Sequence, residues 1–232
     1  MNIRITEIKR ESLHSLKGNW GLAVLLTFIM FILNYFLFFM VNIILTGGLN
    51  AWSNQEEINL GVGIINIIFH ILLIPLSIGV FWFYLSLVRK NNPQISNVFS
   101  VYQNGKTPIK LIAATILQGI FVFLWALLLF IPGIIKGLAY SQTFYILRDH
   151  PEYTILEAIS ESRRKMHGYK WKYFLLQLSF IGWEILCLFT LGIGFLWLVP
   201  YVSTAKATFY NRVIYNQDAD TSDNAIINEK LG

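Results

Sequence analysis

Four ionisable side chains stand alone inside long apolar stretches of this 232-residue chain, and they are the first candidates for chemistry. A charged group at the centre of a bilayer costs roughly 2.5–3.5 kcal/mol on insertion scales, so a chain keeps such residues for packing or for function. We therefore interpret them as a candidate intramembrane polar cluster. Its members are His70, Lys136, Glu184 and Lys206.

Glu184 and Lys206 belong to two consecutive predicted helices that are joined by a glycine-containing turn. At 1.5 Å per residue, they lie roughly 12 Å and roughly 18 Å from that turn. We expect them to meet, either as a buried ion pair that fixes helix packing or as a polar, proton-coupled site for a small substrate. In a further alternative, Lys206 extends towards the inner membrane surface. Lys136 is expected at the outer rim of its helix, and His70 as a hydrogen-bonding residue between helices.

A second group of candidates is basic and lies in the longest polar segment. Its members accompany Trp171 and Tyr173, which are residue types enriched at membrane interfaces. Anionic lipids attract such clusters by about 1 kcal/mol per basic residue. The pattern fits ordinary anchoring of a cytoplasmic loop, or a docking surface for anionic head groups or a cytoplasmic partner. The five residues are Arg163, Arg164, Lys165, Lys170 and Lys172.

The sequence motifs of familiar catalytic centres are missing. There is no HExxH zinc motif, no GxSxG nucleophile motif and no GxxxxGK phosphate loop. Cys187 is the single cysteine and lies in an apolar run. His150 and His167 lie at opposite ends of a charged helix and so do not form a metal-binding pair. We therefore expect a protein that is not an enzyme and that holds neither a metal nor a cofactor. The net charge of +5 is spread between apolar stretches, so nucleic acid is not an expected partner.

The apolar stretches require membrane-spanning helices. Only 13% of the residues are charged, whereas soluble domains carry roughly 25%. A helix needs about 20 apolar residues to cross the hydrocarbon, and the stretches are long enough for six crossings. The predicted fold is an all-α, polytopic membrane helix bundle with six transmembrane helices in three hairpins. The helices are expected at 19–45, 59–88, 110–130, from the 131–133 turn to 147, 172–190, and from the 191–194 turn to 213.

Polar segments with short apolar stripes separate these helices. Segments 94–103 and 154–167 are predicted to form short cytoplasmic interfacial helices. Thr154 and Glu157 fit a capping box, and Gly168 is a natural helix end. In the first of these segments the apolar stripe comprises Ile95, Val98, Phe99 and Tyr102. The chain thus divides into an N-terminal amphipathic segment (1–17), a transmembrane domain (18–214) and a polar cytoplasmic tail (215–232).

The distribution of Lys and Arg predicts the orientation. With the N-terminus inside, sixteen of the eighteen basic residues face the cytoplasm, because they lie in 1–17, 89–110, 148–172 and beyond 211. Only Lys136 falls on the opposite side, and Lys206 lies within the sixth helix. The positive-inside rule then places both termini in the cytoplasm. We expect a multi-pass protein of the cytoplasmic membrane.

A repeat is visible at the ends of the second, fourth and sixth predicted helices. Each helix begins near a proline and ends with an aromatic pair followed by an arginine. The pattern indicates a threefold repeat of one hairpin, or merely the features that any membrane hairpin shows at its ends. The three aromatic pairs with their arginines are Phe83-Tyr84 with Arg89, Phe144-Tyr145 with Arg148, and Phe209-Tyr210 with Arg212.

The densest set of recognisable residues lies in 131–210. It comprises Ile131-Pro132-Gly133-Ile134-Ile135-Lys136, Ala139-Tyr140-Ser141, Ala158, Ser162-Arg163, Gly168, Trp171, Gly182-Trp183 and Pro200-Tyr201. With these residues the chain resembles a bacterial membrane protein family, number nine hundred and seventy-five among the domains of unknown function. The resemblance implies a six-helix membrane protein and supplies no reaction and no catalytic residues.

Two functions lead at this level, and an enzyme comes third. The first is a non-enzymatic, accessory or protective role in the bacterial cell envelope, which follows from the missing catalytic motifs and the basic interfacial segments. The alternative is a small-molecule or lipid transporter that uses the outer-half polar cluster, since internal repeats are common in transporters. The expected partners are the lipid bilayer, anionic head groups on the cytoplasmic side, and a membrane-protein partner or a second copy of the chain.

Overall fold

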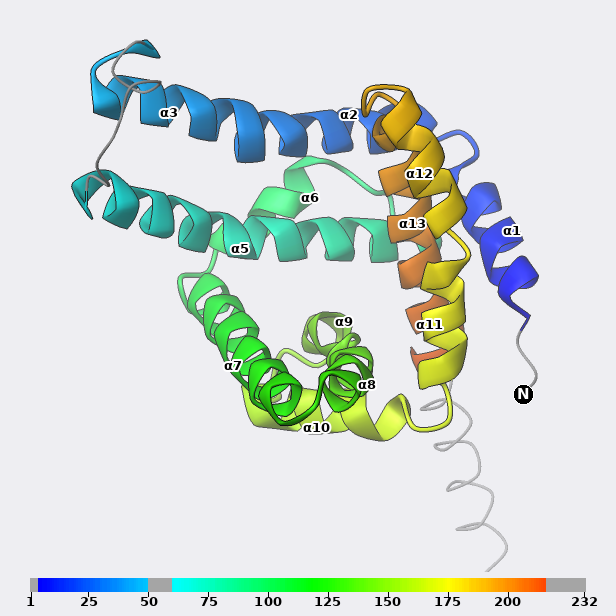
Figure 1. Cartoon of the computed structure of the whole chain (residues 1–232). Coiled ribbons are helices and arrows are strands. Elements are labelled where there is room, and N and C mark those ends of the chain that lie inside the picture. The colour runs from blue at the N-terminus through cyan, green and yellow to red at the C-terminus, as the bar shows by residue number, and fades with distance from the viewer. Residues whose placement is uncertain (1–3, 50–59, 216–232) are drawn as a thin grey trace, which may run out of the picture.

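The computed structural model describes residues 4–49 and 60–215, and every regular element in these ranges is a helix (Figure 1). The predicted all-α fold class is therefore confirmed. The predicted polar tail lies, from residue 216 onward, outside the described residues.

The first two predicted helices are confirmed. α2 (Trp20–Phe31) continues through a π-helical turn, η1 (Ile32–Phe36), into α3 (Leu37–Thr46), and α5 (Leu60–Val88) runs back beside them (Figure 1). The side-chain amides of two asparagines bond across this pair, which matters because an unpaired amide in an apolar setting is costly. Asn42 Nδ2 donates to Asn66 Oδ1 at 3.1 Å, and Asn66 Nδ2 donates to Asn42 Oδ1 at 2.8 Å.

The third predicted helix is also confirmed and begins earlier than expected, as α7 (Lys106–Leu128). Extended backbone at Leu129 reverses the chain into α8 (Phe130–Tyr140), which packs against α7. A Cβ atom at Gly133 would lie 2.7 Å from the Cβ of Ala126. Glycine at this position therefore permits the close approach of the two helices.

The fourth predicted helix is interrupted, which corrects the expectation of one continuous span. α8 gives way to α9 (Thr143–Asp149) at Ser141 and Gln142. A side chain from a distant part of the sequence stabilises the break: Ser162 Oγ donates to Ala139 O at 2.8 Å and accepts from Gln142 N at 3.2 Å. Because Ser162 bonds to both backbone groups, neither is left unpaired in the interior.

The last two predicted helices form a closely spaced group. α11 (Lys170–Leu178) and α12 (Ile181–Phe189) follow each other with one irregular step between them. After a turn that contains Gly192 at φ +86°, α13 (Phe195–Phe209) runs back against α12 and continues as a π-helical turn, η3 (Tyr210–Tyr215).

Two amphipathic helices cover this group and its neighbours. α1 (Ile5–Leu16) buries Ile8 and Leu16 and packs on α13, where Ser12 Oγ donates to Thr208 Oγ1 at 3.1 Å. α10 (Ile155–Lys165) begins with the predicted capping box and packs on α8 and α9. Its buried side chains include Ala158, Ile159 and Ser162. Gly168 has φ +82°, as expected for a helix end.

The segment that follows α5 folds back along it. α6 (Ser96–Phe99) and a 3-10 turn, η2 (Ser100–Tyr102), both contact α5. The predicted apolar stripe is only partly right, because Val98 and Val101 are the buried residues. Phe99 and Tyr102 remain 46% and 40% exposed.

Four helical stretches are long and apolar enough to cross a membrane. They are Trp20–Thr46, Leu60–Val88, Lys106–Leu128 and Lys170–Phe189. The two remaining predicted crossings correspond to the interrupted α8–α9 pair and to α13, which has 15 residues before the π-helical turn. By length and composition these four helices are candidate membrane spans.

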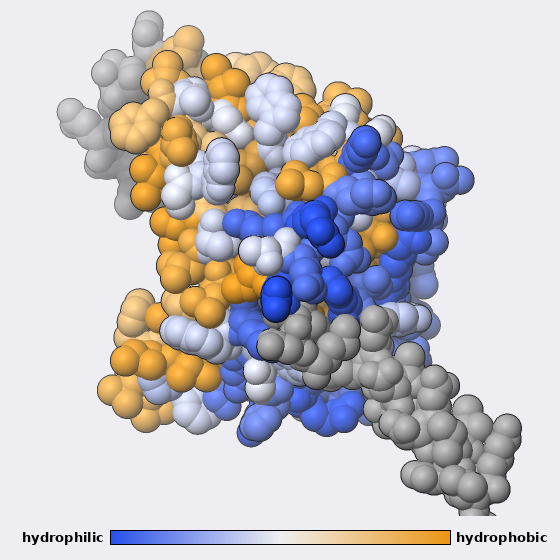
Figure 2. All heavy atoms as spheres, turned by 90° about the vertical axis from the view of Figure 1, so that its right-hand side faces the viewer, coloured by the Kyte–Doolittle hydropathy of each residue, from blue (hydrophilic) through white to orange (hydrophobic). Residues whose placement is uncertain are grey.

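The long helices of this fold run in three different directions. Figure 1 shows α2–α3 beside α5, with α11 and α12 running across their direction and α7 on a third course. Large apolar side chains stay exposed at the far ends of these helices, among them Ile44, Leu127 and Phe189 at 76%, 73% and 83%. In Figure 2 hydrophobic residues occupy one side of the visible face, and hydrophilic residues gather on the other. Apolar surfaces of this extent indicate contact with lipid or protein.

Substitution of Gly79 tests the fold-back of α6. A Cβ atom at Gly79 would lie 2.5 Å from the main-chain oxygen of Val98, which cannot rotate away, whereas Gly63 on the same helix has open space. We expect Gly79→Ala to lower the free energy of unfolding by about 1–3 kcal/mol, as overpacking does. The control Gly63→Ala should be neutral or slightly stabilising. Thermal unfolding in detergent micelles compares the two variants, and equal melting temperatures would show that α6 does not pack at Gly79.

Candidate functional site

The ends of three helices meet at the carboxylate of Asp149, the last residue of α9. Arg89, which follows α5, pairs with it in bidentate fashion: Nη1 lies 2.6 Å from Oδ1 and Nη2 lies 2.7 Å from Oδ2. Tyr210, the first residue of η3, donates its hydroxyl to Oδ2 at 2.7 Å. Asn211 Oδ1 accepts from Arg89 Nε at 2.9 Å. We call these four residues the Asp149 junction.

The junction is shielded from solvent, which strengthens its bonds. The side chains of Arg89 and Asp149 are 21% and 10% exposed, and bidentate pairs of this kind are short and strong. Burial alone would lower the pKa of Arg89, but the hydrogen bond and the charge of Asp149 raise it above its ordinary value. The ring of Tyr215 lies 4.4 Å from the Arg89 guanidinium and adds a cation–π contact. The ion pair joins the ends of α5 and α9, and the bonds of Tyr210 and Asn211 add η3.

The arginines of the sequence repeat all lie at helix ends, but each has a different partner. Arg89 pairs with the junction carboxylate, whereas the guanidinium of Arg148 lies 5.0 Å from the ring of Trp82. Arg212 forms ion pairs with two carboxylates of α1 and so fastens this N-terminal helix to η3. The two acids are Glu7 and Glu11, each at 3.3 Å.

The sequence pointed to Arg89 and Tyr210 through the repeat, but Asp149 and Asn211 were missed. Asp149 carries one signal that was available: in the repeat, only Arg148 is followed directly by an acidic residue. Asn211 carries none, since a single amide after an aromatic pair is common. Pairing between helix ends that are about 60 residues apart in sequence is a tertiary property.

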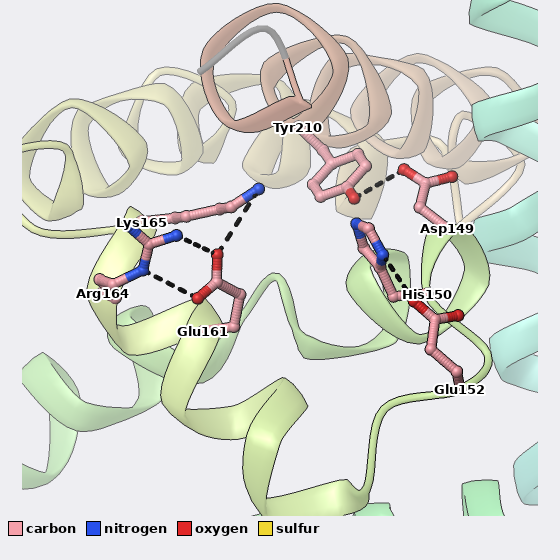
Figure 3. A network of polar contacts seen from close by, with 7 residues as sticks. All are labelled: Asp149, His150, Glu152, Glu161, Arg164, Lys165 and Tyr210. Carbon is pink, nitrogen blue, oxygen red and sulfur yellow. Dashed lines mark hydrogen bonds and ion pairs between the residues drawn. The ribbon is translucent and has the colours of Figure 1, made fainter. Parts of the chain in front are cut away.

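A second polar group lies beside the junction, on the opposite side of Tyr210 (Figure 3). Glu161 on α10 accepts from Arg164 Nε at 2.8 Å and lies 3.8 Å from Lys165 Nζ. The hydrogen bond from Arg164 lowers the pKa of Glu161. In Figure 3 the side chain of Lys165, only 5% exposed, extends towards Tyr210. The bonds named here lie within α10, and Figure 3 shows the group facing the junction across Tyr210.

The five basic residues predicted as an anionic-lipid or partner surface divide into two sets. Two of them, on α10, are bonded to Glu161 as described above. The other three have no ion pair with a carboxylate in the described part of the chain. These are Arg163, Lys170 and Lys172, at the end of α10 and the start of α11.

The four residues predicted as an intramembrane polar cluster do not assemble at one place. His70 is exposed on α5, with its ring 4.9 Å from that of Phe38. Lys136 extends over the ring of Trp125 at 4.2 Å. Lys136 lies within electrostatic range of Arg163 and Lys170.

The expected pairing of Glu184 with Lys206 is loose. Glu184 is exposed on α12, and Lys206 is half-buried on α13. The carboxylate acts electrostatically on the ammonium group. Within 4.0 Å, however, the described residues provide neither group with an ion-pair partner.

One cavity of about 230 Å³ lies among η1, α5, α7 and α9. Its polar lining consists of Asn34, His70, Ser77 and Thr115, and the rest is aliphatic or aromatic. Ser77 and Thr115 donate their hydroxyl protons to carbonyl groups of their own helices, so they offer acceptor oxygens. Within the described ranges, no group of three or more His, Cys, Asp or Glu is placed to hold a metal ion.

Removal of the junction carboxylate should be costly. Asp149→Asn leaves Arg89 without its counter-charge, and loss of one partner of a buried pair costs about 3–5 kcal/mol, with the lower end expected here because Arg89 is partly exposed. The control Arg148→Met removes a neighbouring charge that makes a cation–π contact with Trp82, worth about 0.5–1 kcal/mol. Denaturant unfolding in mixed micelles measures both. If Asp149→Asn is no more harmful than Arg148→Met, the junction does not hold the helix ends together.

Comparison with known proteins supplies a family. A family model described as a protein of unknown function, DUF975, matches residues 1–136 and 127–217. The two matches include every residue of the Asp149 junction and the basic segment. No curated protein and no solved structure matches the chain. The resemblance seen in the sequence is confirmed, and the chain belongs to the DUF975 family.

Proposed function

We propose that this protein is a multi-pass protein of the bacterial cytoplasmic membrane that serves as a non-enzymatic accessory or protective factor of the cell envelope. The observation that carries the proposal is the separation of two surfaces. The helices that are long enough to cross a bilayer expose large apolar side chains along their outer parts. Hydrophilic residues gather in another area (Figure 2). An apolar surface of this kind is stable only in contact with lipid or protein.

The proposed topology has six crossings with both termini in the cytoplasm. The four long stretches account for four crossings, and the α8–α9 and α13–η3 stretches are proposed for the other two. A break such as that at Ser141 is tolerated in a membrane when a side chain satisfies the freed backbone groups, and Ser162 does so. Exposed basic side chains, among them Arg10, Lys90 and Arg163, all belong to the segments proposed to lie inside.

The polar groups support a structural role rather than a reaction. Members of the Asp149 junction bond to one another, and Glu161 of α10 bonds to Arg164 on the same helix. The basic end of α10 and the start of α11 form a surface for anionic head groups on the cytoplasmic side. The exposed apolar helix faces are suited to a membrane-protein partner or to a second copy of the chain.

A transporter of a small molecule or lipid is the second candidate, and the cavity favours it. The cavity combines an apolar lining with the imidazole of His70 and the amide of Asn34, a mixture that is typical of ligand pockets. The predicted outer-half cluster does not add to it, because Lys136 and Glu184 lie elsewhere.

Cysteine labelling tests the topology. In a Cys187→Ala background we expect an impermeant thiol reagent on intact cells to label Ser53→Cys, which lies outside the described residues. Gln103→Cys and Ser160→Cys are at exposed positions, and they should react only after permeabilisation because the most basic segments face the cytoplasm. Labelling of Ser160→Cys on intact cells would contradict the proposed orientation.

Complementation of a deletion strain separates the two functions. His70→Leu and Thr115→Val change the polarity of the cavity lining but leave the junction and the basic surface intact. The accessory proposal predicts that both variants restore tolerance of envelope stress or antimicrobial peptides as well as the native chain does. Asp149→Asn should fail, because the helix ends separate. If the two cavity variants lose tolerance or export although they fold and reach the membrane, the transporter is the better account.

A further inference from the structure

The cavity among η1, α5, α7 and α9 has the size of a ligand site. Its volume is about 230 Å³. A cavity of about 150 Å³ is already large enough to bind a molecule of the size of benzene. This cavity therefore has room for a ring or for a chain of several carbon atoms.

The α5 side of the cavity is elongated and mostly apolar. The lining residues of α5 recur with the helical period and lie on one face of the helix, from His70 to Phe81. At 1.5 Å per residue this face is roughly 16 Å long. The ring of Phe144 on α9 stacks on that of Phe81, with centroids 6.4 Å apart, so this end of the lining is aromatic. Such a lining is suited to an extended apolar body that lies along α5.

Two helical irregularities border the cavity. The lining residue Asn34 lies in η1, and π-helical turns of this kind occur frequently at functional sites. Pro75 directly follows the lining residue Ile74 and has no N–H to donate to the carbonyl group of Ile71. An apolar helix needs neither feature to cross a membrane. Their occurrence at the same place therefore favours a binding role for it.

The polar side chains of the lining offer both kinds of hydrogen-bonding group. Ser77 and Thr115 donate their single hydroxyl hydrogens to carbonyl groups of their own helices, at 3.2 Å and 2.9 Å, so their oxygens can only accept further bonds. Asn34 Nδ2 donates to Met30 O at 2.8 Å and keeps a second N–H. A neutral imidazole at His70 has one donor and one acceptor nitrogen. A bound group can therefore donate to a hydroxyl oxygen and accept from the amide or the imidazole.

The charge of the lining narrows the class of ligand. Among the described residues that line the cavity there is no Asp, Glu, Lys or Arg, so a bound ion would have no counter-charge in an apolar setting. A plain acyl chain, in turn, would leave the amide of Asn34 and the imidazole of His70 without a partner from the ligand. A neutral molecule with a hydroxyl group and an apolar body meets both conditions, because a hydroxyl donates one hydrogen bond and accepts others.

We propose that this cavity binds a membrane-dissolved alcohol, whose hydroxyl donates to Ser77 or Thr115 and whose apolar body lies along α5. In the proposed topology Ser77 lies roughly 18 Å from Arg89 at the cytoplasmic end of α5, so the ligand enters from the bilayer. Binding at this cavity goes beyond the proposed accessory role, which does not depend on it. It also names the class of molecule that the transporter candidate would have to handle.

Photolabelling of the full-length protein in lipid nanodiscs tests the site. The probe is an octanol that carries an aliphatic diazirine, and mass spectrometry of peptides locates the adducts. We expect the adducts to concentrate on the lining residues of α5 and α7, and unlabelled 1-octanol to compete with the probe. Its isomer 1-methoxyheptane has an acceptor oxygen but no donor. Because it lacks one hydrogen bond, it should need about a five- to tenfold higher concentration in the membrane to compete.

A double substitution tests the two acceptor oxygens. Ser77→Ala with Thr115→Val removes both and keeps the apolar lining, so labelling of the cavity should fall by about fivefold or more. The control Thr46→Val removes a hydroxyl that likewise donates to a carbonyl group of its own helix, at 2.9 Å, but lies outside the cavity. It should change labelling by less than about twofold. Unfolding curves check each variant, and the single substitutions replace the double one if it does not fold.

Three outcomes would overturn the proposed site. Adducts spread evenly over the exposed residues of α5 and α7 would show partition into the bilayer without binding at the cavity. Equal competition by 1-methoxyheptane would show that the hydroxyl group is not recognised. Native-like labelling of the double variant would remove Ser77 and Thr115 from the site. Complementation is read separately: if labelling behaves as expected but Thr115→Val loses tolerance, the accessory role fails and the binding site stands.

Discussion

A carboxylate that is nearly buried must be neutralised, and at Asp149 this requirement joins the chain's main helices. Its side chain is 10% exposed and has the Arg89 guanidinium on one side and the Tyr210 hydroxyl on the other. These partners come from α5 and η3, so no single hairpin can satisfy the acid by itself. Because buried ionised groups are stable only with charge and hydrogen bonds supplied in good geometry, the junction fixes where three helix ends lie. The helices diverge from this region (Figure 1).

Much of the fold could be predicted from the sequence because apolar length is a local property. Helices α2–α3, α5 and α7 and the α11–α12 stretch follow from apolar runs, and the start of α10 follows from its capping box. Depth within the membrane could not be predicted in the same way. Counting residues from a turn assumes straight, parallel helices, whereas α8 is short and packs beside α10 and α11.

The break between α8 and α9 shows the same limit. Nothing near Ser141 in the sequence terminates a helix strongly, and the deciding contact comes from Ser162, about twenty residues further on. The members of the Asp149 junction were harder to predict than the helices. Arg89 followed from a repeat, but its pairing with Asp149 is seen only once helix ends about 60 residues apart are brought together. For Glu184 and Lys206 the sequence predicted proximity, and the structure provides electrostatic interaction without a close pair.

These features give the molecule two chemically different regions with separate tasks. The far parts of the long helices are apolar and exposed, as contact with lipid requires. The converging ends carry the ion pairs and the amphipathic helices α1 and α10. In the proposed orientation this polar region faces the cytoplasm, and the Asp149 junction joins three helix ends within it.

The distance between the helix ends in a membrane tests this account most directly. Spin labels at Lys90 and Arg148, the neighbours of Arg89 and Asp149, report on it in lipid nanodiscs by double electron–electron resonance after replacement of Cys187. The account predicts one short, narrow distance distribution that broadens when Asp149→Asn is introduced. A long or broad distribution in the native background, or one that Asp149→Asn leaves unchanged, would contradict the claim that this ion pair holds the helices together.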